Sequence, residues 1–81
     1  MASYAKVKNS HGEYDMVCRF ESKEDMDKVI ADLDRRFYYK PVSERWANDF
    51  VIEHGARWTG PFTYYGGTPL DGISFYHTIY D

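Results

Sequence analysis

The sequence has almost none of the cysteine that holds small extracellular domains together: Cys18 is the only one among 81 residues. One cysteine excludes an intramolecular disulfide and a zinc site made of cysteines alone. Because a secreted domain of this size usually needs disulfides, the sequence favours a reducing, cytoplasmic location. No apolar run approaches the roughly 18 residues of a membrane-spanning helix, and no apolar signal segment follows Met1. We therefore expect no association with a membrane.

Positive charge is also scarce in this chain. The chain has ten lysine and arginine residues and thirteen aspartate and glutamate residues, which gives a net charge of −3. The longest basic run is Arg35-Arg36. Since affinity for nucleic acid depends on cationic side chains that neutralise phosphates, a DNA or RNA partner is disfavoured, although not excluded.

The patterns typical of catalytic and metal sites are missing. The three histidines fall in three different segments and none forms a pair at ligand spacing: His11, His54 and His77. Gly66-Gly67 lacks the lysine and the helix that follow a phosphate-binding glycine loop. Cys18 lies in an apolar alternation without cationic neighbours, which is not the setting of a reactive thiolate. We predict a protein that is not an enzyme, with no catalytic residue, bound metal or cofactor.

Alternating apolar residues predict β-strands at both ends of a single domain that spans residues 1–81. A loose alternation over Ser3–Lys8 and a clear one over Tyr14–Phe20 flank a turn, and together they predict a β-hairpin. Ile73–Ile79 alternates well and predicts a terminal strand. Ala56–Thr59 and Phe62–Tyr65 are short and fit either strands or extended loops.

Two helices are predicted between these strands. Ser22 is a plausible N-cap for a helix over Lys23–Phe37, in which five residues form one apolar stripe: Met26, Val29, Ile30, Leu33 and Phe37. Ser43 is a second N-cap candidate, and the segment up to His54 has a broad apolar face before Gly55. Phe50–Ile52 alone also fits a short strand. The predicted fold is α+β: a small antiparallel sheet of an N-terminal hairpin and C-terminal strands, with two helices packed on one face, in the order ββααβ(β)β.

Aromatic residues are the one unusual abundance, at 19% of the chain with eight tyrosines, five phenylalanines and two tryptophans. Adjacent aromatic residues, as in Tyr64-Tyr65, cannot all be buried on one face of a strand or helix. We predict that the exposed ones gather into a binding surface of six residues: Tyr38, Trp58, Tyr64, Tyr65, Tyr76 and Tyr80. The simpler alternative is that tyrosines only cover the edge of a thin sheet.

The predicted function is a non-enzymatic, protein-binding module. By size and composition the chain resembles the small acidic proteins with which bacteriophages and mobile elements inhibit or regulate host machinery, so a bacterial enzyme or complex is the expected partner. The alternative is a nucleic-acid or nucleotide binder that uses an aromatic sheet face. The sequence names no particular partner, and it leaves a homo-oligomer open.

Overall fold

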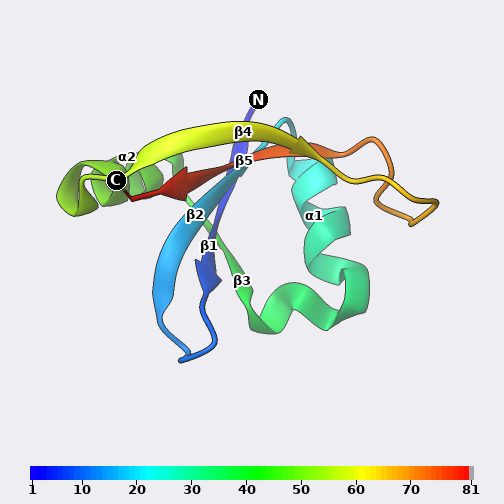
Figure 1. Cartoon of the computed structure of the whole chain (residues 1–81), viewed down its shortest axis with the longest axis horizontal. Coiled ribbons are helices and arrows are strands. Elements are labelled where there is room, and N and C mark those ends of the chain that lie inside the picture. The colour runs from blue at the N-terminus through cyan, green and yellow to red at the C-terminus, as the bar shows by residue number, and fades with distance from the viewer. Residues whose placement is uncertain (81) are drawn as a thin grey trace.

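The computed structural model describes residues 1–80, which form a five-stranded antiparallel sheet with two α-helices (Figure 1). The elements follow the order β1 (Ser3–Lys8), β2 (Tyr14–Phe20), α1 (Lys23–Ala31), the 3-10 segment η1 (Asp32–Phe37), β3 (Tyr39–Val42), α2 (Glu44–His54), β4 (Arg57–Thr63) and β5 (Ser74–Ile79). Across the sheet the strand order is β3-β1-β2-β5-β4. The predicted α+β class with an antiparallel sheet is confirmed.

The β1–β2 hairpin sets the register of the sheet. In its turn, the Asn9 side-chain oxygen accepts hydrogen bonds from the backbone N–H groups of His11 at 2.8 Å and Glu13 at 3.1 Å. The strands then pair from Lys8 opposite Tyr14 to Ser3 opposite Phe20, with a bulge next to Lys8. This register decides which side chains of the two strands share a face.

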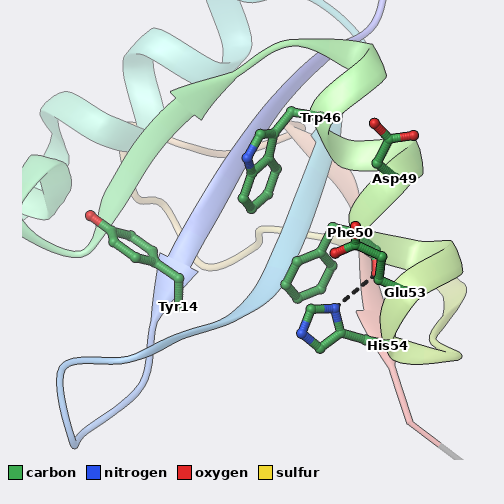
Figure 2. Close-up of a pocket in the computed structure, with 6 residues that line it drawn as sticks. All are labelled: Tyr14, Trp46, Asp49, Phe50, Glu53 and His54. Carbon is green, nitrogen blue, oxygen red and sulfur yellow. Dashed lines mark hydrogen bonds between the residues drawn. The ribbon is translucent and has the colours of Figure 1, made fainter.

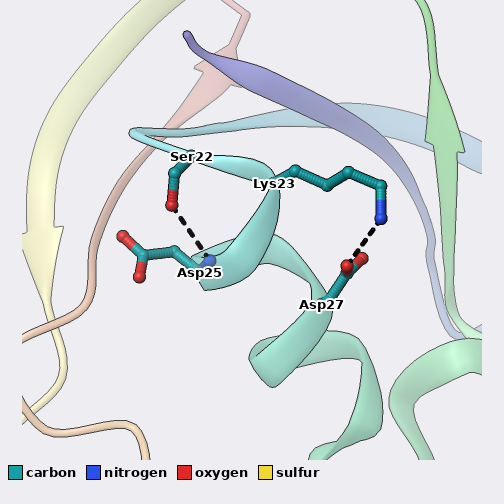
Figure 3. A network of polar contacts seen from close by, with 4 residues as sticks. All are labelled: Ser22, Lys23, Asp25 and Asp27. Atoms are coloured by element: carbon teal, nitrogen blue, oxygen red, sulfur yellow. Dashed lines mark hydrogen bonds and ion pairs between the residues drawn. The ribbon is translucent and has the colours of Figure 1, made fainter.

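Both helices begin at the predicted serine caps. The Ser22 hydroxyl accepts from the Asp25 N–H at 3.1 Å, beside an exposed ion pair between Lys23 and Asp27 at 2.8 Å (Figure 3). The Ser43 hydroxyl accepts from the Trp46 N–H at 3.0 Å, and α2 ends at Gly55, whose φ of 60° lies in the left-handed region. Helix rather than strand is therefore confirmed for residues 50–52.

The two helices cover opposite faces of the sheet, so the prediction that both pack on one face is wrong. Neighbouring residues on β2 show this directly, because Val17 and Cys18 point to opposite faces and are 0% and 1% exposed. Cys18 packs in the cluster that contains Met26 of α1, whereas Val17 packs with Phe50 of α2. A strand that buries both faces needs a cover on each, and Figure 1 shows α1 and α2 well separated around the strands.

The first helix is also shorter than predicted. It ends at Ala31. The predicted apolar stripe is wrong at its C-terminal end, because Leu33 is 83% and Phe37 67% exposed. Leu33 and Asp34 have φ values of 51° and 57°, which break the helix. The break lets the chain turn back to form β3, a strand that was not predicted, whose Tyr39 pairs with Val7 and packs against the core. Pairing at the sheet edge thus overrides the local helical pattern.

The C-terminal part forms one long hairpin. Residues 57–63 make a single strand with an irregularity at Gly60-Pro61, where two short segments were expected. In the loop before β5, both Asp71 carboxylate oxygens accept backbone N–H groups, from Gly67 at 2.9 Å and Thr68 at 3.2 Å. The loop thereby places Leu70 in the core beneath α1.

Candidate functional site

The face of the sheet that α2 covers, called here the α2 face, carries a small core. Tyr4, Val17, Ala47 and Phe50 are buried there, with Val42 and Trp58 packed against them. The α1 face is the opposite one, where Phe20 and Cys18 pack beneath α1. Because α2 buries only Ala47 and Phe50 of its own residues, much of the α2 face lies outside this core.

A continuous row of aromatic rings and lysine side chains crosses the α2 face and shares Phe50 with this core. We call this row the aromatic–lysine stripe, and it consists of Phe37, Lys8, Tyr14, Lys6, Trp46, Phe50, His54 and Tyr80. Each member contacts the next one. The stripe joins side chains from η1, β1, β2, α2 and the residue that follows β5.

The lysines link the rings in the first half of the stripe. The Lys8 ammonium lies 5.2 Å from the centre of the Phe37 ring and 5.3 Å from that of Tyr14. The Lys6 ammonium lies 4.2 Å from the centre of the Tyr14 ring and 5.2 Å from that of Trp46. At these distances an ammonium group is attracted by the negative face of a ring, which holds both cations in place.

The second half of the stripe follows the helical repeat of α2. Trp46 and Phe50 are stacked with ring centres 5.5 Å apart, and Phe50 and His54 with centres 4.1 Å apart. Residues four apart lie on one face of a helix, so this spacing dictates the stack. The His54 Nδ1 lies 3.0 Å from the Phe50 carbonyl oxygen, and since a carbonyl can only accept, Nδ1 carries the proton. In the neutral ring Nε2 is then the acceptor.

A pocket of about 330 Å³ opens along this stack (Figure 2). Its lining residues are Tyr14 from β2 and five from α2: Trp46, Asp49, Phe50, Glu53 and His54. The rings form its apolar walls, and the exposed carboxyl groups of Asp49 and Glu53 stand on the helix. The pocket is therefore apolar inside and acidic along its helical wall.

Among residues 1–80, the lysines of the stripe form no ion pair with a carboxylate. Among residues 1–80, the ion pairs join Lys23 to Asp27, Lys28 to Glu24 and Arg36 to Asp34, all within α1 and η1. Lys6 lies directly opposite Lys40 in the β1–β3 ladder, so a third lysine shares this face. Arg19 lies over the ring of Tyr76 at 4.4 Å. Lys6, Lys8 and Arg19 on the α2 face thus contact aromatic rings.

Four of the six predicted surface residues lie on or beside the α2 face. Tyr80 is 48% exposed, lies next to His54 in the stripe, and donates its hydroxyl to the Asp15 carbonyl at 2.7 Å. Tyr38 touches Phe37 edge-to-face, with ring centres 5.2 Å apart. Trp58 and Tyr76 flank Arg19, and Trp58 is partly buried against Tyr4.

The other two predicted residues lie apart from this group. Tyr64 packs against the core of the α1 face, and its hydroxyl accepts from Arg35 Nη1 at 3.0 Å. Tyr65 is 79% exposed in the loop that follows β4. The structure therefore does not bring Tyr64 and Tyr65 together with Tyr38, Trp58, Tyr76 and Tyr80.

Most of the stripe is not predicted from the sequence. Trp46, Phe50 and His54 lie on the apolar face predicted for the second helix, where their four-residue spacing also predicts a stack. Lys6 and Lys8 alternate with the core residues Ala5 and Val7, so they had to share the opposite face of β1. The spacing within each segment indicates which of its residues share a face, but only the register of the sheet and the position of α2 bring the segments together.

The buried titratable groups lie away from the stripe. Burial raises the pKa of the Cys18 thiol to about 12, and it raises the pKa of the Tyr39 hydroxyl to about 12 as well. Within residues 1–80, His, Cys, Asp and Glu side chains do not gather in threes that could hold a metal ion. The chemistry that the stripe itself offers is stacking, cation–ring contact, hydrogen bonding and charge.

The chain was compared with known protein families, curated proteins and solved structures, and no significant match was found in any of the three comparisons. In the part of the chain that the structure describes, neither helix has the length and apolar character needed to cross a membrane.

Proposed function

We propose that the protein is a non-enzymatic, protein-binding module and that it engages its partner through the aromatic–lysine stripe. The observation that carries the proposal is the unbroken row of contacting rings and lysines on the α2 face. Phe37, Trp46 and Tyr80 in this row are 67%, 37% and 48% exposed. Large aromatic side chains are the residues that most often dominate the binding energy of protein interfaces.

The stripe is better suited to an interface than to stability alone. Phe50 of the stripe belongs to the small core of the α2 face, whereas Phe37, Trp46 and Tyr80 are exposed to solvent. A pocket of about 330 Å³ opens along Trp46, Phe50 and His54. Stiff rings lose little conformational entropy when a partner covers them, and their mutual stacking fixes them in advance. A partner that covers the stripe therefore gains apolar burial at a small ordering cost.

An inhibitor or regulator of a bacterial host complex, of the kind encoded by bacteriophages and mobile elements, is the specific form of this proposal. It is supported by the short length, the net charge of −3 and the high aromatic content alone. Homo-oligomerisation through the same surface would be a special case, in which the partner is a second copy of the chain.

Binding of single-stranded nucleic acid is the second candidate function. One observation favours it: Lys6, Lys8, Lys40 and Arg19 share a face with aromatic rings, and none of them forms an ion pair within residues 1–80. The acidic wall of the pocket opposes it, because phosphates next to the rings would meet the carboxylates of α2. We therefore place protein binding first.

The proposal is tested by affinity capture from a bacterial lysate, with and without nuclease treatment, with the wild-type chain, Trp46→Ala and Phe62→Ala as baits. Phe62 is a matched control because it is a similarly exposed ring, at 42%, that stacks on His77 of the α1 face. We expect the captured protein to be lost, by at least about tenfold, with Trp46→Ala and to be retained with Phe62→Ala, the effect of removing a hot-spot ring.

Two results would contradict the proposal. Equal recovery with both variants would show that the stripe is not the binding surface. Recovery that disappears entirely on nuclease treatment would favour the nucleic-acid alternative. Light scattering of the purified chain, run in parallel, reveals whether the captured species is a second copy of the protein itself.

A further inference from the structure

We propose that the segment recognised by the aromatic–lysine stripe is an acidic peptide segment with an apolar anchor. Its carboxylates would lie along Lys6, Lys8 and Lys40, and one large apolar side chain would fill the pocket between Tyr14 and α2. This inference rests on the proposed function, which states only that the stripe binds protein, and it adds the chemistry of the partner.

The lysines on β1 and β3 provide the first argument. Lys6 and Lys40 are directly opposite each other in the β1–β3 ladder, and Lys8 follows Lys6 on the same face. Like charges directly opposite across two strands repel each other. Partner carboxylates placed along this line would relieve the repulsion, so the site is complementary to negative charge.

The positions of the ammonium groups strengthen this argument. Lys6 is held between the rings of Tyr14 and Trp46, and Lys8 between those of Tyr14 and Phe37, at 4.2 to 5.3 Å from the ring centres. A lysine on a free surface must be ordered when it meets a carboxylate, which offsets much of the gain. Here the rings have already restricted the side chains.

The pocket next to the lysines provides the apolar anchor point. Its volume of about 330 Å³ is at the small end for a ligand pocket, which suits one aromatic or large aliphatic side chain. In Figure 2, Trp46, Phe50 and His54 line it on the side of α2, with Tyr14 across from them. A side chain inserted here would stack on rings that already stack on each other.

The charges on the two sides of the pocket give the segment a direction. Asp49 and Glu53 stand on α2, whereas the lysines stand on the strands. Acidic residues of the partner are therefore favoured toward β1 and β3, and neutral or basic residues toward α2. Complementary charges of this kind select one orientation of a bound peptide. A uniformly charged phosphodiester chain cannot satisfy both sides.

The experiment titrates the full chain, labelled with ¹⁵N, with four probes. NMR follows the chemical shifts of the Trp46 indole N–H and of the backbone amides of β1 and β2. The probes are a random copolymer of glutamate and tyrosine, polyglutamate, a random copolymer of lysine and tyrosine, and oligothymidylate. We expect the glutamate–tyrosine copolymer to shift these signals at the lowest concentration, polyglutamate to bind more weakly, and the other two probes to leave them unchanged.

A pair of charge variants makes the test specific. The double variant Lys6→Gln/Lys8→Gln should weaken binding of the glutamate–tyrosine copolymer by about tenfold, the combined effect of two ordered charge contacts. Lys23→Gln/Lys28→Gln removes the same charge from α1, where both lysines are paired with carboxylates, and it should bind like the wild type. Dispersed NMR spectra of both variants verify that they are folded.

Each contrary result has a definite meaning. The inference is wrong if the glutamate–tyrosine copolymer causes no shift, if the lysine–tyrosine copolymer binds as tightly, or if both double variants weaken binding equally. Tighter binding of oligothymidylate at the same signals would overturn it in favour of nucleic acid. Failure of the acidic inference leaves the Trp46→Ala capture result intact, whereas failure of protein binding through the stripe shows in the capture experiment itself.

Discussion

The two faces of this sheet differ in how completely they are covered and in how their charges are satisfied. On the α1 face, Phe20 and Val29 are 1% and 0% exposed, and the loop before β5 adds Leu70 and Ile73 to the same cluster. On the α2 face, the helix buries only Ala47 and Phe50, and rings continue beyond it into solvent. The α1 face is therefore the more completely covered of the two, and the α2 face leaves aromatic rings exposed beside its smaller core.

The charges follow the same division. Helix α1 and η1 hold carboxylates beside their own cations, with pairs at 2.8 to 3.4 Å. The lysines of β1 instead contact aromatic rings. A net charge of −3 thus conceals a cationic strip on one side of the molecule. The overall charge of a chain is a weak guide to its partner when unpaired cations gather on one strip of the surface.

The largest difference between the faces should appear in stability. Phe20→Ala removes a fully buried ring from the α1 face, and we expect it to lower the free energy of unfolding by about 3–5 kcal/mol. Trp46→Ala removes a larger ring from the stripe, but this ring is 37% exposed, and the substitution should cost about 1 kcal/mol or less. Urea unfolding followed by far-UV circular dichroism measures both. Equal losses would mean that the stripe is part of the core.

The buried thiol on the α1 face predicts a loss of stability at alkaline pH. The pKa of Cys18 is raised from 9.0 to about 12 because burial penalises the thiolate. Above pH 9 the unfolded chain therefore releases this proton while the folded chain keeps it. The unfolded state then binds fewer protons, so stability falls as pH rises between 9 and 12.

At pH 10 this loss should reach about 1.4 kcal/mol relative to pH 8, the value of one pKa unit. Cys18→Ala removes the titrating group, so its unfolding free energy should change much less between pH 8 and pH 10. The measurement is urea unfolding at both pH values for the two proteins, with the pH dependence compared rather than the absolute stability. An identical slope in the variant would show that Cys18 is not the group responsible.

The sequence predicted the parts of the fold that neighbouring residues determine. Ser22, Ser43 and Gly55 mark helix ends where their side chains or backbone satisfy the terminal groups, and the structure confirms all three. The sequence pattern did not predict β3 or the end of α1, because these depend on pairing between Tyr39 and Val7, which are far apart in the chain. Likewise, Val17 is buried by α2, a segment far from it in the chain, so the spacing within β2 alone does not predict its burial.

The candidate site was predicted less well than the fold, for the same physical reason. An aromatic residue is identified as exposed only when its surroundings are known, and Tyr64, expected at the surface, packs against the α1 core instead. The stripe requires the β1–β2 register to place Lys6 over Tyr14, and the position of α2 to place it near Trp46. Contacts between distant segments are not readable from the spacing within any one of them.

The smallest expected effect concerns Leu33, which the helical pattern placed in the core stripe. In that stripe an aspartate would be a buried charge and would unfold the domain. In the structure Leu33 is 83% exposed and has a φ of 51°, a region that aspartate tolerates better than leucine. Leu33→Asp should therefore change the free energy of unfolding by no more than about 0.5 kcal/mol.

Val29→Asp is the matched comparison for this substitution, because Val29 lies one helical turn earlier and is completely buried against β1 and β2. Thermal unfolding of the two variants separates the alternatives directly. If α1 ends at Ala31, only Val29→Asp unfolds the protein, since its carboxylate has no partner in an apolar cluster. If both variants unfold, the helix continues through residue 33 and the apolar stripe is longer than the structure shows.

The break at Leu33 is what frees the chain to form β3, and β3 in turn places Lys40 opposite Lys6. A continuous helix would therefore remove one of the three lysines from the face on which the acidic partner is proposed to bind.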